Sequence, residues 1–188
     1  MGPFPDFRLG SVLATSFTAT LTERAGEPVE RIPTPQRLAD WFDVVGLPVG
    51  TCTDHDLTRA VELREAIHRA ATATADGDPL SPRTVRIINA HSARGRASPA
   101  LTPQREHRWR LSRGAEVDDA LGVIAADAIA ILSGERDGRW ALCASPTCRA
   151  AFFDTSRSRS RRWCEMNTCG NKEKKARFTA AHGGSARQ

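Results

Sequence analysis

Four cysteines in the C-terminal part of the sequence constrain its fold most. They form two pairs, Cys143-x4-Cys148 and Cys164-x4-Cys169, with 15 residues between the pairs. Two pairs at short, equal spacing suit one tetrahedral metal ion, and thiolate is the ligand that structural zinc prefers. Four thiolates leave no open coordination position, so we expect a structural rather than a catalytic zinc ion. Two disulfides are the alternative, whereas a redox pair is disfavoured because redox motifs use Cys-x2-Cys.

The rest of the sequence favours a reducing compartment. No run of about 18 apolar residues is present, which predicts no membrane-spanning helix, and the first residues lack the basic-then-apolar pattern of a signal peptide. We therefore expect a cytoplasmic protein with no membrane partner, in which paired cysteines bind metal rather than form disulfides. Cys52 stands apart from the pairs and is interpreted as a small, partly buried apolar residue, with a reactive thiol as the alternative.

Positive charge is concentrated around the cysteines. Residues 139–188 contain 11 Lys and Arg against 3 Asp and Glu, a net charge of +8, whereas residues 1–138 contain 16 against 19, a net charge of −3. This asymmetry favours a polyanionic partner for the C-terminal part alone. A solvated basic surface, or one that pairs with the acidic part or with a protein partner, is the alternative. The candidate nucleic-acid contacts are Arg157, Arg159, Arg161, Arg162, Lys172, Lys174, Lys175 and Arg177.

The first 138 residues are typical of a helix-rich α+β domain with a small β element. Residues 8–22 mix Thr, Val, Phe and Leu, which predicts a strand or a strand that runs into a loop. Further along, a capping residue or an acidic first turn precedes each apolar repeat of helical spacing. The expected helices cover residues 34–46, 53–77, 81–91 and 116–133, with a loop or irregular hairpin over 92–105 and a short strand over 107–112. Gly134 and Gly138 mark the expected domain boundary.

The order of elements expected around the cysteines is that of a treble-clef zinc finger. We expect strands over 140–142, 151–154 and 163–164, a polar turn over 156–162, a helix over 167–180 and a disordered tail over 181–188. A segment of about 40 residues buries too little apolar surface to fold alone, so the metal would supply the missing stability. Phe152, Phe153 and Trp163 would form a small core beside the metal, and Asp154 and Ser156 would organise the turn.

The residues around the second cysteine pair resemble the CGNR zinc-finger family. Residues 161–172 read Arg-Arg-Trp-Cys-Glu-Met-Asn-Thr-Cys-Gly-Asn-Lys. The family signature ends in Arg where this chain has Lys172, which keeps the charge but loses the bidentate fork. In that family the finger follows an N-terminal ABATE domain, to which residues 8–133 are similar in outline. The resemblance implies a stress-induced transcription regulator, with an ABATE-like ligand-sensing domain over 1–138 and the finger over 139–180.

The leading hypothesis is therefore a transcription regulator that binds DNA through a structural Zn²⁺ finger. Its first domain would sense a small-molecule ligand or mediate association, for example as a homodimer. An RNA-binding protein and a protein-interaction adaptor are alternatives, and a small-molecule enzyme using the first domain is a weaker one. The sequence contains no catalytic motif, so we do not expect an enzyme.

The other polar residues of the first domain are interpreted as structural, and two of them are candidate ligand contacts. Arg64 interrupts an apolar helix face and could meet a ligand or a carboxylate, and Asn89 is a second candidate ligand contact. Glu62, Glu65 and His68 lie three residues apart on one helix and are interpreted as a solvent-facing stripe rather than metal ligands. The remaining histidines, all expected at the surface, are His55, His91, His107 and His182.

Overall fold

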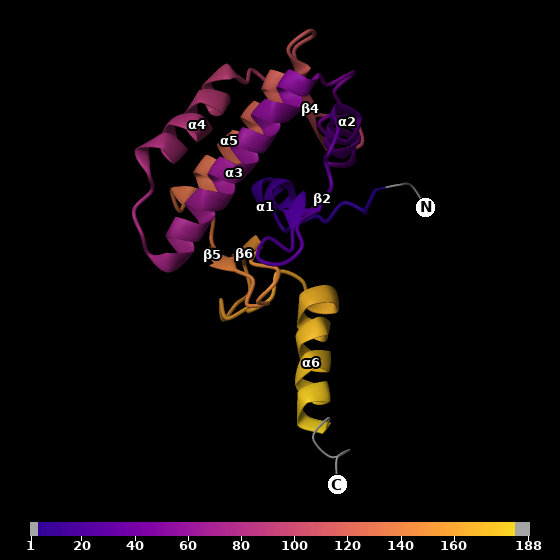
Figure 1. The fold of residues 1–188 in the computed structure, drawn as a ribbon. Helices are drawn as coiled ribbons and strands as arrows, with labels where there is room; N and C mark the ends of the chain where they lie inside the picture. Colours follow the sequence, from indigo (N-terminus) through magenta and orange to yellow (C-terminus); the bar gives the residue numbers. More distant parts are fainter. Residues whose placement is uncertain (1–3, 183–188) are drawn as a thin grey trace.

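Three long helices form the body of the protein. The structure, a computed structural model, describes residues 4–182, and the side chains of residues 4–179. Helices α3 (Asp54–Asp76), α4 (Pro82–Arg94) and α5 (Glu116–Leu132) pack side by side (Figure 1). The β elements in this part of the chain are small antiparallel hairpins, so the expected helix-rich α+β fold is confirmed.

Short elements surround the three helices. The hairpins pair β1 with β2, β3 with β4, and β5 with β6. Their bounds, with those of the other helices, are α1 (Leu13–Thr18), β1 (Leu21–Thr22), β2 (Val29–Glu30), α2 (Pro35–Val44), β3 (Ser98–Leu101), β4 (His107–Arg110), β5 (Arg139–Leu142), β6 (Ala151–Asp154), the π-helical turn η1 (Met166–Gly170) and α6 (Asn171–His182).

The helix starts follow the capping residues that the sequence offers. Thr53 and Asp56 form a capping box at the start of α3, in which each side chain accepts a hydrogen bond from the other residue's backbone N–H. At the other end of α3, Gly77 takes the left-handed conformation with φ of 79°, which costs glycine least. Thr34 and Ser81 cap α2 and α4 by accepting a hydrogen bond from the amides of Arg37 and Thr84, and proline follows each cap at the first helical position.

The strand expected over residues 8–22 is wrong for residues 13–18, which form helix α1, whereas residues 21–22 form strand β1. The amide of Ala14, one of the donors left unpaired at a helix start, donates to the Asp127 carboxylate of α5 at 2.8 Å. The ring of Phe17 packs 5.1 Å from that of Trp41. Tertiary contacts therefore overcome the strand preference of the β-branched and aromatic residues.

Helices α4 and α5 approach each other through two glycines. A Cβ atom added to Gly122 would lie 2.5 Å from the Cα of Gly95, so neither position has room for a side chain. Nearby, the buried Asp119 carboxylate accepts hydrogen bonds from the amides of Arg96 and Ser112, at the two ends of the β3–β4 hairpin. The expectation of a surface His91 is wrong, because its side chain is buried at this packing site.

The finger is packed onto the helical body rather than separate from it. Trp140 of β5 and Ala151 and Phe153 of β6 belong to the same apolar core as α3 and α5. The small core expected beside the metal is therefore wrong in part: Phe153 lies in the main core and Phe152 is buried outside both clusters, whereas Trp163 packs against the cysteines. Helix α6 extends away from the body (Figure 1) and continues to residue 182; most of the tail expected over 181–188, residues 183–188, lies outside the described residues.

Candidate metal centre and cationic surface

The β5–β6 hairpin presents the first cysteine pair. Cys143 directly follows β5, and its amide donates to the carbonyl of Ala150 at 2.9 Å, which extends the hairpin by one bond. The Cys148 amide donates to the carbonyl of Ser145 at 3.2 Å and closes the tight turn between the two cysteines. Both cysteine side chains are buried. The hairpin thus fixes two sulfurs on the same side of one turn.

The second pair comes from a loop and a helical turn. The strand expected at residues 163–164 is wrong; a backbone bond from the Ala144 amide to the Arg162 carbonyl at 2.8 Å helps to hold this segment against the first pair. Cys169 lies on η1 and is followed by Gly170, where an added Cβ would lie 2.3 Å from the sulfur of Met166. The same Cβ would lie 3.2 Å from the Trp163 ring, so Gly170 is packed closely against two side chains.

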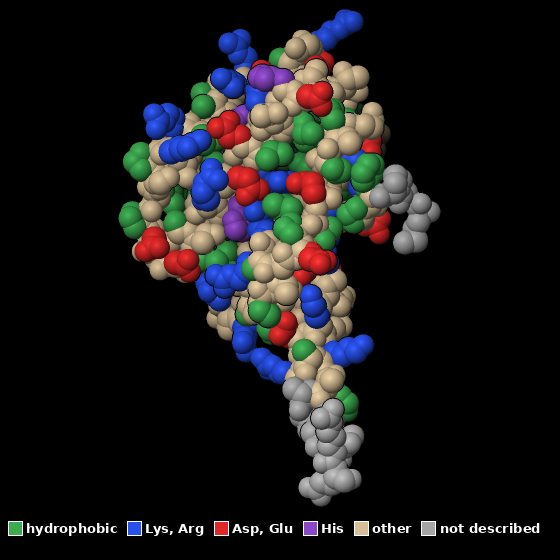
Figure 2. Space-filling view, viewed as in Figure 1, with side chains coloured by type: hydrophobic (Ala, Val, Ile, Leu, Met, Phe, Trp, Pro, Cys, Tyr) green, Lys and Arg blue, Asp and Glu red, His purple; other side chains and the backbone are tan. Residues whose placement is uncertain are grey.

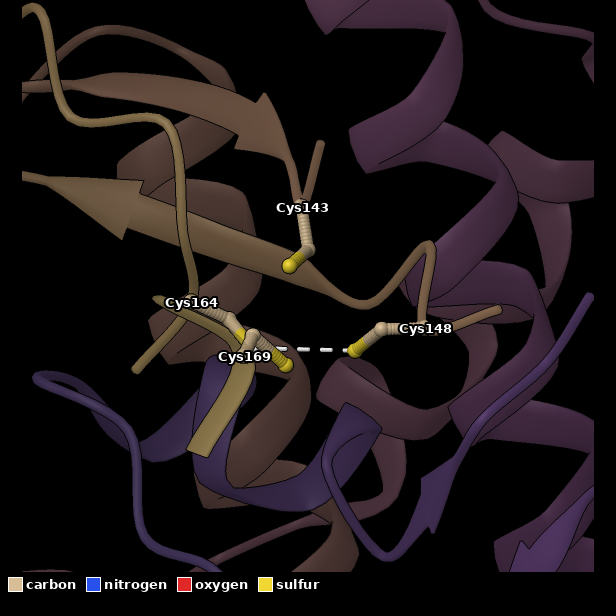
Figure 3. A group of neighbouring side chains, drawn as sticks. All are labelled: Cys143, Cys148, Cys164 and Cys169. Carbon is tan, nitrogen blue, oxygen red and sulfur yellow. Dashed lines mark hydrogen bonds between the residues drawn. The ribbon is translucent and has the colours of Figure 1, made fainter. Parts of the chain in front are cut away.

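The four sulfur atoms converge on one point (Figure 3). All lie within 4.8 Å of one another, and the sulfur of Cys164 is 3.7 Å from that of Cys148 and 3.6 Å from that of Cys169. A tetrahedral zinc with Zn–S bonds of about 2.3 Å would place its sulfurs about 3.8 Å apart. The cysteines are not disulfide-bonded. The cluster therefore has the donor type and the spacing of a metal site.

The electrostatics of the cluster also favour a cation. Hydrogen bonds from the thiols of Cys148 and Cys164 lower the pKa of Cys143 to about 2. The contact with Cys143 raises the pKa of Cys148 to about 12. Contacts with Cys143 and Cys148 also raise the pKa of Cys164. Without a cation, the cluster thus favours ionisation of one thiol, Cys143, and opposes ionisation of Cys148 and Cys164. A divalent cation among the sulfurs would remove that opposition, because thiolates are the ligands that it binds.

A buried carboxylate organises the turn between the cysteine pairs, as the sequence predicts. Asp154 accepts hydrogen bonds from the amide and hydroxyl of Ser156, at 3.0 and 2.6 Å, and from the amide of Arg161 at 2.9 Å. Burial opposes ionisation, but these hydrogen bonds lower the pKa of Asp154 below its ordinary value. The turn that carries the arginines is therefore fixed from within.

Four arginines line a hollow of about 310 Å³ beside the metal cluster. Arg161 and Arg162 were expected at a nucleic-acid surface, but Arg139 and Arg149 were missed. Asp76, at the end of α3, is the carboxylate in its lining. We call this set, Arg139, Arg149, Arg161 and Arg162, the arginine hollow. No residue spacing reveals it, because β5, the first cysteine turn and the loop before Cys164 each contribute to it.

The charges of the hollow are only partly neutralised. The side chain of Arg139 lies 3.7 Å from Asp154. That of Arg161 donates to the carbonyls of Trp163 and Cys164, which are uncharged. Among the described residues, neither Arg149 nor Arg162 forms an ion pair, and the Arg162 guanidinium lies over the Trp163 ring at 5.2 Å. The hollow therefore keeps a net positive charge.

The other predicted basic residues divide into paired and exposed ones. Lys172 lies 3.3 Å from Glu23, and Arg159 pairs with Asp137. Figure 2 shows Lys and Arg side chains around the narrow part of the molecule that the finger forms. Four exposed basic side chains have no ion pair among the described residues: Arg157 on the turn, and Lys174, Lys175 and Arg177 on α6.

The two candidate ligand contacts in the first domain do not share a pocket. Arg64 is buried and pairs with Glu30 at 2.8 Å and Glu65 at 2.9 Å, so carboxylates of the fold satisfy its charge. Asn89 instead lines a shallow hollow on α4 with Leu80. The two assignments remain predictions, but the geometry favours a structural role for Arg64.

The solvent-facing stripe expected on α3 is wrong for two of its three residues. Glu62 is exposed, but Glu65 pairs with Arg24 at 2.8 Å. The imidazole Nε2 of His68 lies 3.3 Å from the carbonyl oxygen of Arg149. Burial lowers the pKa of His68 to about 4, so the ring is neutral at pH 7. Both residues therefore fasten α3 to neighbouring segments.

Comparisons with known families agree with this architecture. Residues 11–135 match the ABATE family, described as "Putative stress-induced transcription regulator". Residues 139–182 match the CGNR zinc finger. The chain belongs to the ABATE family and carries a CGNR zinc finger. The resemblance seen in the sequence is thereby confirmed. A search of curated proteins found no match. Over the described residues, this ABATE protein has no helix with the length and hydrophobicity that crossing a bilayer requires.

Proposed function

We propose that this chain is a transcription regulator whose zinc finger binds DNA. The hairpin, the cysteine turn and the following helix support a treble-clef finger closed by one Zn²⁺. Its ligands would be the two cysteine pairs, each buried or half-buried. The ABATE part would sense a ligand or mediate association between copies. Residues 11–135 match a family described in terms of transcription regulation, which supports the regulatory role.

The arginine hollow is the observation that carries the DNA-binding proposal. Guanidinium groups bind phosphate oxygens in a bidentate manner, and such contacts supply most of the non-specific affinity for DNA. Arg149 and Arg162 face this hollow without a carboxylate partner among the described residues. Helix α6 adds the exposed side chains of Lys174, Lys175 and Arg177. A phosphate backbone would contact both surfaces.

Zinc would act by holding the parts of this surface together. Arg149 follows Cys148 directly, and Arg162 lies two residues before Cys164. The two arginines therefore belong to different cysteine pairs, and a metal ion that joins the pairs fixes the distance between them. Four thiolates would close the coordination sphere, so the role of this zinc is structural rather than catalytic.

The test is a fluorescence anisotropy titration of a labelled DNA duplex with zinc-loaded protein, repeated between about 50 and 200 mM salt. Each arginine that contacts a phosphate adds about −0.9 to the slope of log K against log salt. The double variant Arg149→Ala/Arg162→Ala should therefore bind more weakly, with a slope shallower by about 1.8. No binding by the wild type at low salt would rule out the DNA proposal.

A matched control separates the hollow from overall charge. Arg83 and Arg86 are exposed on α4, so Arg83→Ala/Arg86→Ala removes the same charge elsewhere. The control variant should keep the wild-type slope. An equal loss in both double variants would assign binding to net charge alone. Competition by structured RNA stronger than by duplex DNA would favour the RNA-binding alternative.

A further inference from the structure

We propose that a cavity between the N-terminal segment, residues 4–12, and the finger binds a small organic acid whose carboxylate pairs with Arg8. The cavity has a volume of about 250 Å³. Clefts for drug-sized ligands measure about 300–1,000 Å³, so a smaller molecule fits here. Its walls come from the N-terminal segment and α1 on one side, and from β6 and the loop at Cys164 on the other.

The N-terminal segment is a fixed wall, although it has no regular secondary structure. The Arg37 guanidinium stacks 3.9 Å from the centre of the Phe7 ring and donates to the carbonyl of Pro5 at 3.0 Å. The amide of Gly10 donates to the Ser16 hydroxyl at 2.9 Å. These contacts attach the segment to α1 and α2, so the cavity is formed before any ligand arrives.

Arg8 lines this cavity and carries an unpaired charge. Among the described residues, its buried Nη1 atom has no hydrogen-bond partner, and no carboxylate forms an ion pair with it. Two acids of the β1–β2 hairpin are engaged elsewhere: Glu23 accepts hydrogen bonds from Thr147 and Lys172, and Glu30 pairs with Arg64. Glu165, which lines the cavity, accepts a hydrogen bond from the Thr168 hydroxyl. A buried cationic donor without an acceptor is costly, and an anion in the cavity would remove that cost.

A second guanidinium behind the cavity wall strengthens the positive potential. Arg31 is only 4% exposed, and its side chain donates to three uncharged oxygens: the carbonyls of Asp6 and Val29 and the hydroxyl of Thr22, which itself lines the cavity. Burial, and then the neighbouring charge of Arg8, lower the pKa of Arg31. An anion beside Arg8 would therefore stabilise both guanidinium groups.

The other walls define the rest of the ligand. The aromatic side chains of Phe7 and Phe152 line the cavity and would contact an apolar body. The Arg161 guanidinium is directed to the Trp163 carbonyl at 2.9 Å and lies over the Phe152 ring at 5.2 Å, so it is less available than Arg8. Glu165 also lines the cavity and would repel a dianion more strongly than a monoanion. A monocarboxylate with a short aromatic or aliphatic body satisfies these walls better than free phosphate.

This site goes beyond the family assignment and deepens the sensing role in the proposed function. Arg8 and Phe7 precede residues 11–135, the part matched to the ABATE family. The cavity also reaches Cys164, one of the expected metal ligands. A ligand here would contact the ABATE part and the finger at once. Only the effect of such a ligand on DNA affinity rests on the proposed DNA-binding function.

The experiment is isothermal titration calorimetry of the zinc-loaded full chain with benzoate, benzamide and inorganic phosphate. Benzoate should bind, whereas benzamide, which has the same shape without the charge, should bind at least about tenfold more weakly because it cannot form the charge-assisted pair. Amide resonances of residues 7–11 and 150–153 should shift on benzoate addition. This measurement uses no nucleic acid, so its failure and that of the DNA proposal are distinguishable.

Variants test the position of the site. Arg8→Ala should weaken benzoate binding about tenfold or more, and Arg8→Lys should weaken it less. Ala19→Leu, which fills the cavity from its half-buried rim, should also prevent binding; thermal unfolding checks that each variant folds. Arg83→Ala is the control and should bind as the wild type does. Absence of benzoate binding, equal binding of benzamide, preference for phosphate, or unchanged binding in the Arg8 and Ala19 variants would each overturn the proposal.

Discussion

The ammonium group of Lys172 lies 3.3 Å from the carboxylate of Glu23 and 3.1 Å from the hydroxyl of Thr147. The same Glu23 carboxylate accepts a hydrogen bond from Thr147 at 2.6 Å. Backbone bonds from Arg24 and Ala25 to the first cysteine turn lie beside this contact. The residue that departs from the CGNR signature thus joins the start of α6 to the β1–β2 turn of the ABATE part.

This pairing predicts that Lys172 contributes more to the domain contact than to DNA binding. Partly exposed ion pairs contribute about 0.2–1 kcal/mol, so Lys172→Ala should lower the free energy of unfolding by about that amount and change the salt slope little. Arg149→Ala should make the salt slope shallower and change the free energy of unfolding little. Chemical denaturation and anisotropy on both variants check this, and a double-mutant cycle with Glu23→Gln gives the pair energy. A large change in salt slope with Lys172→Ala would instead place Lys172 on the phosphate backbone.

Metal removal should unfold the finger and leave the helical body folded. Structural zinc contributes about 10–16 kcal/mol in isolated finger peptides, whereas most of the main apolar core comes from residues before the finger, among them Leu63 of α3, Ile88 of α4 and Ile124 of α5. A chelator, or the variant Cys164→Ser, should therefore raise amide hydrogen exchange over residues 143–179 far more than in those helices. Cys52→Ala is the matched control, because this half-buried thiol lies outside the cluster and burial raises its pKa to about 11. Equal exchange in both variants would contradict the prediction.

The protein should lose stability as the pH falls from about 6.5 towards 4. Burial lowers the pKa of His68 from 6.5 to about 4, so in this range the unfolded chain binds a proton that the folded chain excludes. His68→Gln keeps a donor near the Arg149 carbonyl but cannot titrate, and should flatten this part of the stability curve. Denaturation at several pH values, with zinc bound throughout, measures it. An unchanged slope would show that His68 does not cause the loss.

The crossing of α4 and α5 should tolerate no added atoms. Gly122→Ala would place a methyl group 2.5 Å from the Cα of Gly95, and overpacking of this kind costs about 1–3 kcal/mol. Gly50→Ala is the control, since an added Cβ there meets nothing within 4 Å. Thermal unfolding should therefore show a lowered midpoint for Gly122→Ala only. A neutral Gly122→Ala would mean that the helices separate without cost.

The helix starts and the cysteine cluster could be predicted from the sequence, because residues close together in the chain determine them. Helices α2 to α5 begin where a capping residue or an acidic first turn precedes an apolar repeat, as at Thr53 and Asp56. The cysteine spacing predicted a single cluster, and the four sulfurs do converge. These features depend on residues that lie close together in the chain, or on a pattern with few alternatives.

The features that the sequence did not predict depend on contacts between distant residues. Helix α1 is capped by Asp127, which lies 113 residues away. Arg139 and Arg149 reach the arginine hollow only because the hairpin and the cysteine cluster bring three segments together. His68 and Glu65 looked like solvent-facing residues on α3, because nothing nearby in sequence indicates that the finger and the β1–β2 turn cover them.

The most direct test of the account is zinc X-ray absorption on the purified protein, with the metal content measured on the same sample. We predict one zinc per chain with four sulfur neighbours at about 2.3 Å, supplied by Cys143, Cys148, Cys164 and Cys169. A finger that stays folded without metal, or a zinc with nitrogen or oxygen in place of any of these sulfurs, would contradict it.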